Sequence, residues 1–118
     1  KVVPEWTIIN SLVQEFTSKQ DYSFLTADII WWFHGPEHLP KEQSKTIINS
    51  LLKKCKVLVM SMPHGKYPQH HPDLPLEEHV SEFYTKDFDE YRDAYVFYET
   101  INGDDKTSLD VIIRGELW

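Results

Sequence analysis

Histidine is the residue type with the most obvious capacity for chemistry in this sequence, because six are present among 118 residues. Four of them fall between residues 64 and 79: His64, His70, His71 and His79. An adjacent pair in a stretch broken by prolines matches no standard spacing of zinc ligands. His34 and His38 are four residues apart, but Gly35-Pro36 would break the helix that could align them. We therefore expect loop histidines and no dedicated metal site.

Catalytic groups have little support in the sequence. The four glycines form no phosphate-binding loop, and neither G-x-S-x-G nor H-E-x-x-H occurs. Cys55 lies on an apolar stripe, where a thiol is typically a small core residue rather than a nucleophile. Clustered carboxylates are more typical of a solvated acidic surface: Glu77, Glu78, Glu82, Asp87, Asp89 and Glu90. We predict a protein that is not an enzyme and uses no cofactor.

Charge is unevenly distributed along the chain. The net charge is −7, but residues 1–66 carry +2 and residues 67–118 carry −9. This acidic balance argues against a protein whose main task is to coat nucleic acid or anionic lipid. No stretch approaches the roughly 20 apolar residues of a membrane span, and a single cysteine fits a reducing compartment. Because the chain begins at Lys1 without a leader, we expect one domain, residues 1–118, from a longer protein.

Three helices are predicted to position these residues. Apolar residues at spacings of three and four predict a helix from about residue 4 to residue 16. Thr26 as an N-cap and Gly35-Pro36 as a stop predict a short helix over residues 26–34. A regular apolar stripe predicts the third helix over residues 40–55, with lysines on its opposite side.

The second half of the sequence predicts strands. A β-branched, apolar run predicts a strand over residues 56–62. Residues 66–90 are interrupted by prolines and exceed the usual length of a connection, which predicts a long surface insertion. Two strands over 91–101 and 108–113 flank an Asn-Gly turn and predict a hairpin. The expected fold is α+β: a winged-helix-like three-helix bundle with a small antiparallel sheet and a long acidic insertion before the last hairpin.

Aromatic residues outside the expected core are the best pointer to a partner. On a helix over residues 26–34, Trp31 lies off the inward face, and exposed Trp is enriched at interface hot spots. The alternative is that Trp31 packs under the insertion or against Trp118. Three further aromatics are interleaved with acids in the insertion: Phe83, Tyr84 and Phe88. They predict a motif that docks on a basic partner, unless they serve to pin the insertion to the body.

Lysines along the third helix are the rival candidates for partner binding. Lys41, Lys45 and Lys53 would face outward, and the third helix of a winged helix often enters the DNA major groove. However, the first 91 residues contain no arginine, the preferred reader of guanine. The row is also shorter than the four to eight clustered charges expected for anionic-lipid recognition. An ordinary solvated face is therefore the main alternative for these lysines.

Three short motifs resemble those of the DEP domain, a winged-helix-like module of signalling proteins. Residues 24–33, Phe-Leu-Thr-Ala-Asp-Ile-Ile-Trp-Trp-Phe, are similar to the core motif of its second helix, with Trp32 at the family's Trp. Residues 50–58 resemble its leucine pair before a strand, and Tyr95-Val96-Phe97 resembles its closing aromatic strand. The chain departs from the family at Cys55-Lys56, where a small residue is usual, in the long insertion and in an additional strand pair.

The resemblance implies a non-catalytic adaptor that docks on membrane proteins, receptors or partner domains. We therefore expect a protein-interaction module of a multidomain intracellular signalling regulator, located in the cytoplasm and recruited to membranes where its partner resides there. The alternative is a nuclear winged-helix domain of a transcription or chromatin factor that binds DNA or a protein through its third helix. The oligomeric state stays open, and long connections permit domain swapping.

Overall fold

The computed structural model describes residues 11–65, 72–100 and 107–118. These ranges contain two α-helices and four strands, in the order α1 (Val13–Ser18), β1 (Ala27–Phe33), α2 (Lys41–Leu52), β2 (Cys55–Pro63), β3 (Ala94–Thr100) and β4 (Thr107–Arg114). Short 3₁₀ turns lie at Gln20–Tyr22, Pro36–His38, Pro75–Glu77 and Thr85–Phe88. Within the described part of the chain, neither helix has the length and apolar content needed to cross a membrane.

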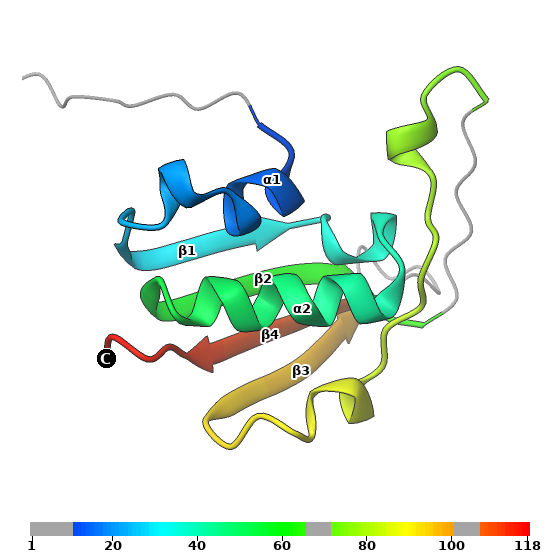
Figure 1. The fold of residues 1–118 in the computed structure, drawn as a ribbon. Coiled ribbons are helices and arrows are strands. Elements are labelled where there is room, and N and C mark those ends of the chain that lie inside the picture. Colours follow the sequence, from blue (N-terminus) through cyan, green and yellow to red (C-terminus); the bar gives the residue numbers. More distant parts are fainter. Residues whose placement is uncertain (1–10, 66–71, 101–106) are drawn as a thin grey trace, which may run out of the picture.

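The strands form one mixed sheet in the order β1-β2-β4-β3. β1 and β2 are parallel and are joined through α2, whereas β2–β4 and β3–β4 are antiparallel pairs. Both α-helices lie on the same side of this sheet, with α2 crossing in front of the central strands and α1 beside β1 (Figure 1). No described element covers the opposite side of the sheet, which we call the open face.

The predicted helix over residues 26–34 is wrong, because this segment is strand β1. Ile30 and Trp32 pack against the core, while Trp31 between them is exposed, so burial alternates with period two. Parallel pairing with β2 satisfies the backbone of this β-branched and aromatic run. The three-helix bundle and its winged-helix arrangement therefore do not form. The α+β class is compatible with the structure, but the sheet is larger than expected and is mixed rather than antiparallel.

The other expected elements have varied outcomes. Helix α2 lies within the predicted range 40–55, and strand β2 covers the predicted range 56–62. The predicted hairpin is confirmed by the antiparallel pairing of β3 with β4, while its Asn-Gly turn lies outside the described residues. Helix α1 starts only at Val13, and the earlier part of the predicted first helix, up to residue 10, also lies outside them.

The core lies between α2 and the covered side of the sheet. It is formed by apolar residues of α2, β2, β4 and the long segment after β2: Ile47, Ile48, Leu51, Cys55, Leu58, Met60, Met62, Phe83, Phe88, Leu109, Val111 and Ile113. Cys55 is fully buried, as predicted for a core thiol, and this burial raises its pKa. Burial of Phe83 and Phe88 ties the predicted surface insertion to the body of the domain.

Candidate interaction surface

Strand register arranges the open face in rows that cross the sheet. One row consists of Trp31, Val59, Ile112 and Tyr95, from β1 to β3. The next consists of Phe33, Ser61, Asp110 and Phe97. Along β1, β2 and β4 these residues alternate with less exposed ones, so their side chains project away from the helices. A third row lies on the other side of the first and contains Ile29, Val57 and Arg114.

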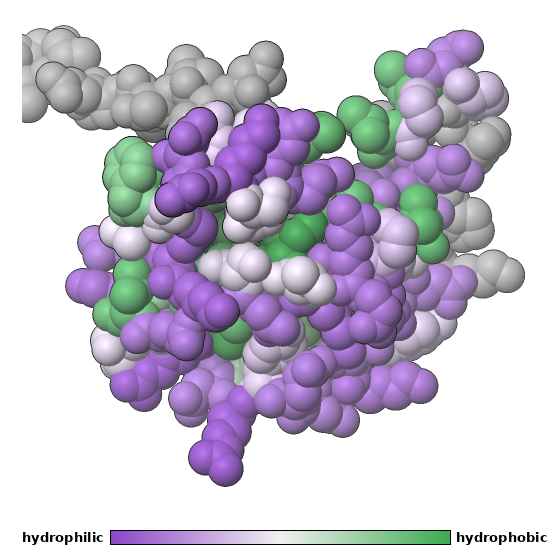
Figure 2. All heavy atoms as spheres, in the orientation of Figure 1, coloured by the Kyte–Doolittle hydropathy of each residue, from purple (hydrophilic) through white to green (hydrophobic). Residues whose placement is uncertain are grey.

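The open face exposes large aromatic side chains. Trp31 and Tyr95 are 63% and 76% exposed, and Phe33 and Phe97 are also exposed. The rings of Trp31 and Phe33 meet edge to face with centroids 5.6 Å apart. By contrast, the helix-covered side of the molecule presents mainly hydrophilic side chains (Figure 2). Large exposed apolar patches are typical of interaction sites.

Opposite charges lie at the two ends of the open face. Asp110 lies in the row of Phe33 and Phe97, where its Oδ1 accepts a hydrogen bond of 3.2 Å from Ser108 Oγ. Arg114 lies four residues further along β4, with its guanidinium 5.2 Å from the centre of the Trp118 ring. The face is therefore polar at both ends, acidic at one and basic at the other, with an apolar row between them.

A pocket of about 450 Å³ opens at the basic end of the open face. Its walls include Val57, Tyr95, Ile112, Arg114 and Trp118. Arg92 and Asp93 also line it, so the pocket combines aliphatic and aromatic walls with groups of both charges. Such a lining suits a large side chain with an apolar or aromatic body. The pocket can therefore receive a side chain from a docked partner.

The predicted partner-binding aromatics lie in different environments. Trp31 is exposed, but on a strand of the open face rather than on a helix. Phe83 and Phe88 are buried in the core, in agreement with the alternative that they pin the insertion to the body. Tyr84 is partly exposed, and its hydroxyl donates a hydrogen bond to Glu82 that raises the pKa of Tyr84. The structure thus leaves Trp31 and Tyr84 accessible to a partner.

Two of the predicted lysines pair with acids of the long segment. Lys41 Nζ lies 3.1 Å from Asp87 Oδ2, and Lys45 Nζ lies 2.9 Å from Glu90 Oε1. The hydrogen bond to Glu90 outweighs burial and raises the pKa of Lys45. Lys53, at the end of α2, is exposed. The expected outward row is thus largely neutralised within the chain, which leaves little basic surface on α2.

Several residues of the open face were not predicted from the sequence to bind a partner: Phe33, Tyr95, Phe97, Asp110 and Ile112. The available signal was the concentration of aromatic residues over 94–98 and 29–33, since neither segment alternates polar with apolar residues. Register, which only the folded sheet defines, places them side by side.

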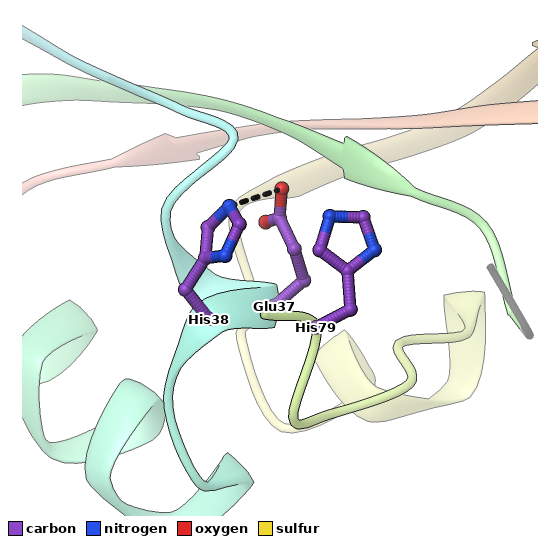
Figure 3. A group of neighbouring side chains, drawn as sticks. All are labelled: Glu37, His38 and His79. Carbon is purple, nitrogen blue, oxygen red and sulfur yellow. Dashed lines mark ion pairs between the residues drawn. The ribbon is translucent and has the colours of Figure 1, made fainter. Parts of the chain in front are cut away.

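Metal-ligating side chains meet outside the open face. Glu37, His38 and His79 each offer one ligand atom, and these atoms lie within 4.8 Å of one another (Figure 3). The sequence predicted no metal site, since it did not reveal that the turn Pro36–His38 and the segment containing His79 come together.

No protein-family model matches the chain, and neither the curated proteins nor the solved structures include one significantly similar to it.

Proposed function

We propose that this chain is a non-catalytic protein-interaction module that docks, through its open face, on a second copy of itself. The observation that carries this proposal is the exposed aromatic face, apolar in the middle and oppositely charged at its ends. The proposal keeps the protein-interaction class expected from the sequence. It relocates the docking surface from a winged-helix element, which the chain does not form, to the sheet.

Two-fold symmetry makes this face complementary to itself. The axis lies in the plane between the two facing sheets, passes over Ile112 and runs perpendicular to β4. It therefore reverses the strand direction in the second copy. Asp110 and Arg114 lie at equal distances along β4 on either side of Ile112. Asp110 of each copy therefore faces Arg114 of the other, and the row of Trp31, Val59, Ile112 and Tyr95 meets the same row of the second copy.

The pocket fits the same arrangement. The axis brings Phe97 of one copy over the basic end of the other copy's face, where the pocket opens beside Arg114. An exposed aromatic ring then reaches the aliphatic and aromatic walls of this pocket, and buried aromatic anchors are typical of interface hot spots. Shape and charge thus support the same pairing.

The size of the face sets the expected affinity. Four strands about 4.8 Å apart and about seven residues long give a surface of roughly 19 by 23 Å. Such an area, roughly 440 Å² per copy, is below that of stable interfaces and is typical of weak, transient ones, so we expect a dissociation constant in the micromolar range. The net charge of −7 also adds repulsion between copies.

Nucleic acid is a less suitable occupant of this face. Aromatic side chains on a sheet can stack on bases, but such sheets depend on basic groups to bind the backbone. Here Asp110 lies within the aromatic face, and the chain as a whole is acidic. Repulsion of phosphate therefore favours a protein as the occupant.

Sedimentation equilibrium of the purified chain, over concentrations from about 1 to 300 µM, tests the proposal. We expect a monomer–dimer equilibrium that Trp31→Ser weakens by at least about tenfold. Phe24→Ser, which removes another exposed aromatic outside the open face, is the matched control and should leave the equilibrium unchanged.

Exchanging the charges of Asp110 and Arg114 tests the two-fold arrangement of the dimer. Asp110→Arg and Arg114→Asp should each weaken the dimer, and the double variant should restore it, since the two charges then exchange places. A chain that stays monomeric at all concentrations overturns the proposal, as does a dimer insensitive to Trp31→Ser. Binding of a labelled single-stranded RNA that depends on Trp31, with no dimer, would instead assign the face to nucleic acid.

A further inference from the structure

We propose that Glu37, His38 and His79 form a binding site for one divalent transition-metal ion, with zinc as the best match. The site is independent of the open face and of the dimer proposed above. Its three ligands come from the turn Pro36–His38 and from the segment that follows the turn Pro75–Glu77.

The side chains already converge. The Glu37 carboxylate lies between the two imidazole rings (Figure 3), and Nε2 of His38 is 3.6 Å from Oε1 of Glu37. The rings of His38 and His79 meet edge to face with centroids 4.9 Å apart. Tetrahedral zinc with bonds of about 2.1 Å holds its ligand atoms roughly 3.4 Å apart. The largest separation of 4.8 Å therefore closes to a coordination sphere by small side-chain rotations.

The burial of Glu37 is the observation that points to a bound cation. Its side chain is 2% exposed, and neither carboxylate oxygen accepts a hydrogen bond from the described residues. A buried carboxylate without such bonds is strongly destabilising unless a positive charge lies next to it. A metal ion bound by Glu37 supplies that charge.

The tautomer of His38 leads to the same conclusion. Its Nδ1 lies 3.0 Å from the carbonyl oxygen of Glu78, which can only accept a hydrogen bond, so Nδ1 carries a proton. In the neutral ring Nε2 is then an acceptor, and it faces the carboxylate of Glu37. In this tautomer the lone pair of Nε2 is available to a metal ion and points toward the Glu37 carboxylate. A backbone carbonyl that fixes one imidazole nitrogen is also the usual outer support of a histidine ligand.

Backbone hydrogen bonds hold the two ligand segments together. The Glu37 carbonyl accepts bonds of 2.7 Å from the amide of Val80 and 3.0 Å from that of Ser81. The buried hydroxyl of Ser44, on α2, donates to the carbonyl of Pro36 at 2.7 Å. The ligands are thus positioned by a fixed scaffold rather than by a free loop, as tight metal sites require.

His34 has a supporting role. Its Nδ1 lies 3.5 Å from Oε1 of Glu37, but its ring is largely exposed and outside the group of three. The residue adopts a left-handed φ of 49°, which a side chain other than glycine's adopts rarely. We assign it to orienting the Glu37 carboxylate, so its loss should weaken binding less than loss of a ligand.

The donor set selects the metal. Two imidazoles with one carboxylate suit zinc and its neighbours, whereas calcium and magnesium prefer oxygen ligands alone. Three protein ligands leave the fourth tetrahedral position to a water molecule or to an added ligand.

Competition titration of tag-free protein against a chromophoric zinc chelator tests the proposal. We expect one zinc ion per chain, and Co²⁺ should give the visible absorption bands of a tetrahedral site. Glu37→Gln, His38→Ala and His79→Ala should each reduce affinity about 100-fold or more, and His34→Ala about tenfold. His64→Ala is the control and should bind as the unaltered chain does, because the His64 ring stacks on Tyr98 and is not one of the three converging ligands.

Folding of each variant is checked separately by circular dichroism. Zinc should raise the melting temperature of the unaltered chain and of His64→Ala, but not that of Glu37→Gln. The absence of stoichiometric binding overturns the proposal. Binding that survives all three ligand substitutions in folded protein overturns it as well, because the ion then lies elsewhere.

Discussion

Lys41 Nζ lies 3.1 Å from Asp87 Oδ2, although 46 residues separate the two in the sequence. The same carboxylate oxygen accepts a hydrogen bond of 2.8 Å from the amide of Tyr84, at the start of the turn Thr85–Phe88. One acid thus joins helix α2 to the long segment after β2. The contact pairs a lysine from the basic first part of the chain with an acid from the acidic second part. This acidic residue therefore helps to hold the fold together.

Asp87→Asn should therefore destabilise the fold by about 0.5–2 kcal/mol, through loss of both the turn cap and the ion pair. Urea unfolding at low and high salt measures this effect, and added salt should reduce the difference from the unaltered chain. Asp89→Asn, at an exposed position two residues away, is the control. Equal loss of stability in both variants would show that general charge, and not the contact with Lys41, is responsible.

Phe83 gives a sharper test of whether the long segment belongs to the core. Its ring is fully buried and stacks near Phe88 with centroids 6.0 Å apart. Phe83→Ala should reduce the free energy of unfolding by about 3–5 kcal/mol, since it removes a buried aromatic and leaves a cavity. Phe24→Ala, at a residue 76% exposed, should change it by less than about 0.5 kcal/mol. Denaturant titration measures both free energies of unfolding. If the long segment were only a surface insertion, both substitutions would change the free energy of unfolding by a small amount.

The sequence allowed prediction of elements whose pattern was unambiguous. Helix α2 has a clear amphipathic period, and the β3–β4 hairpin is rich in β-branched and aromatic residues. β1 could not be identified because Ile29 to Phe33 is apolar without interruption, so it satisfies helical and strand periods alike. Pairing with β2, a tertiary interaction, decided the outcome.

The candidate sites were less accessible to sequence reasoning than the elements were. Trp31 was a candidate for exposure, but on a helix that does not form and with burial left as the alternative. Its neighbours Val59 and Tyr95 depend on strand order and register. His38 and His79 meet because backbone hydrogen bonds of Val80 and Ser81 join distant segments, and no local spacing encodes that contact.

The alkaline stability of the fold should depend on Tyr91. Burial first, and the charge of Glu90 second, raise the pKa of Tyr91 to about 12, and its hydroxyl donates to Asn49 at 3.1 Å. A phenol with an unfolded pKa of about 10 loses its proton first in the unfolded state. Its contribution to stability is therefore complete below pH 10 and is lost as the pH rises from about 10 to 12.

Tyr91→Phe should accordingly reduce the dependence of stability on pH in that window. Urea unfolding at intervals from pH 8 to 12 measures the slope for both proteins. The variant should also be somewhat less stable at pH 8, because the bond to Asn49 is absent. Parallel slopes above pH 10 would show that other groups, and not Tyr91, set the alkaline limit.

Gly115 occupies a position where no larger residue fits. Its amide donates to the carbonyl of Lys56 at 2.7 Å, and a Cβ added there would lie 2.1 Å from the backbone oxygen of Cys55. Because that obstacle is backbone, a side-chain rotation cannot relieve it, and the end of β4 must move away from β2. Gly115→Ala should therefore destabilise the fold by about 1–3 kcal/mol, whereas Glu116→Ala, at the exposed neighbour, should have little effect. Thermal unfolding of the two variants decides the matter, and an unchanged Gly115→Ala would mean that the chain after β4 does not pack against β2 as described.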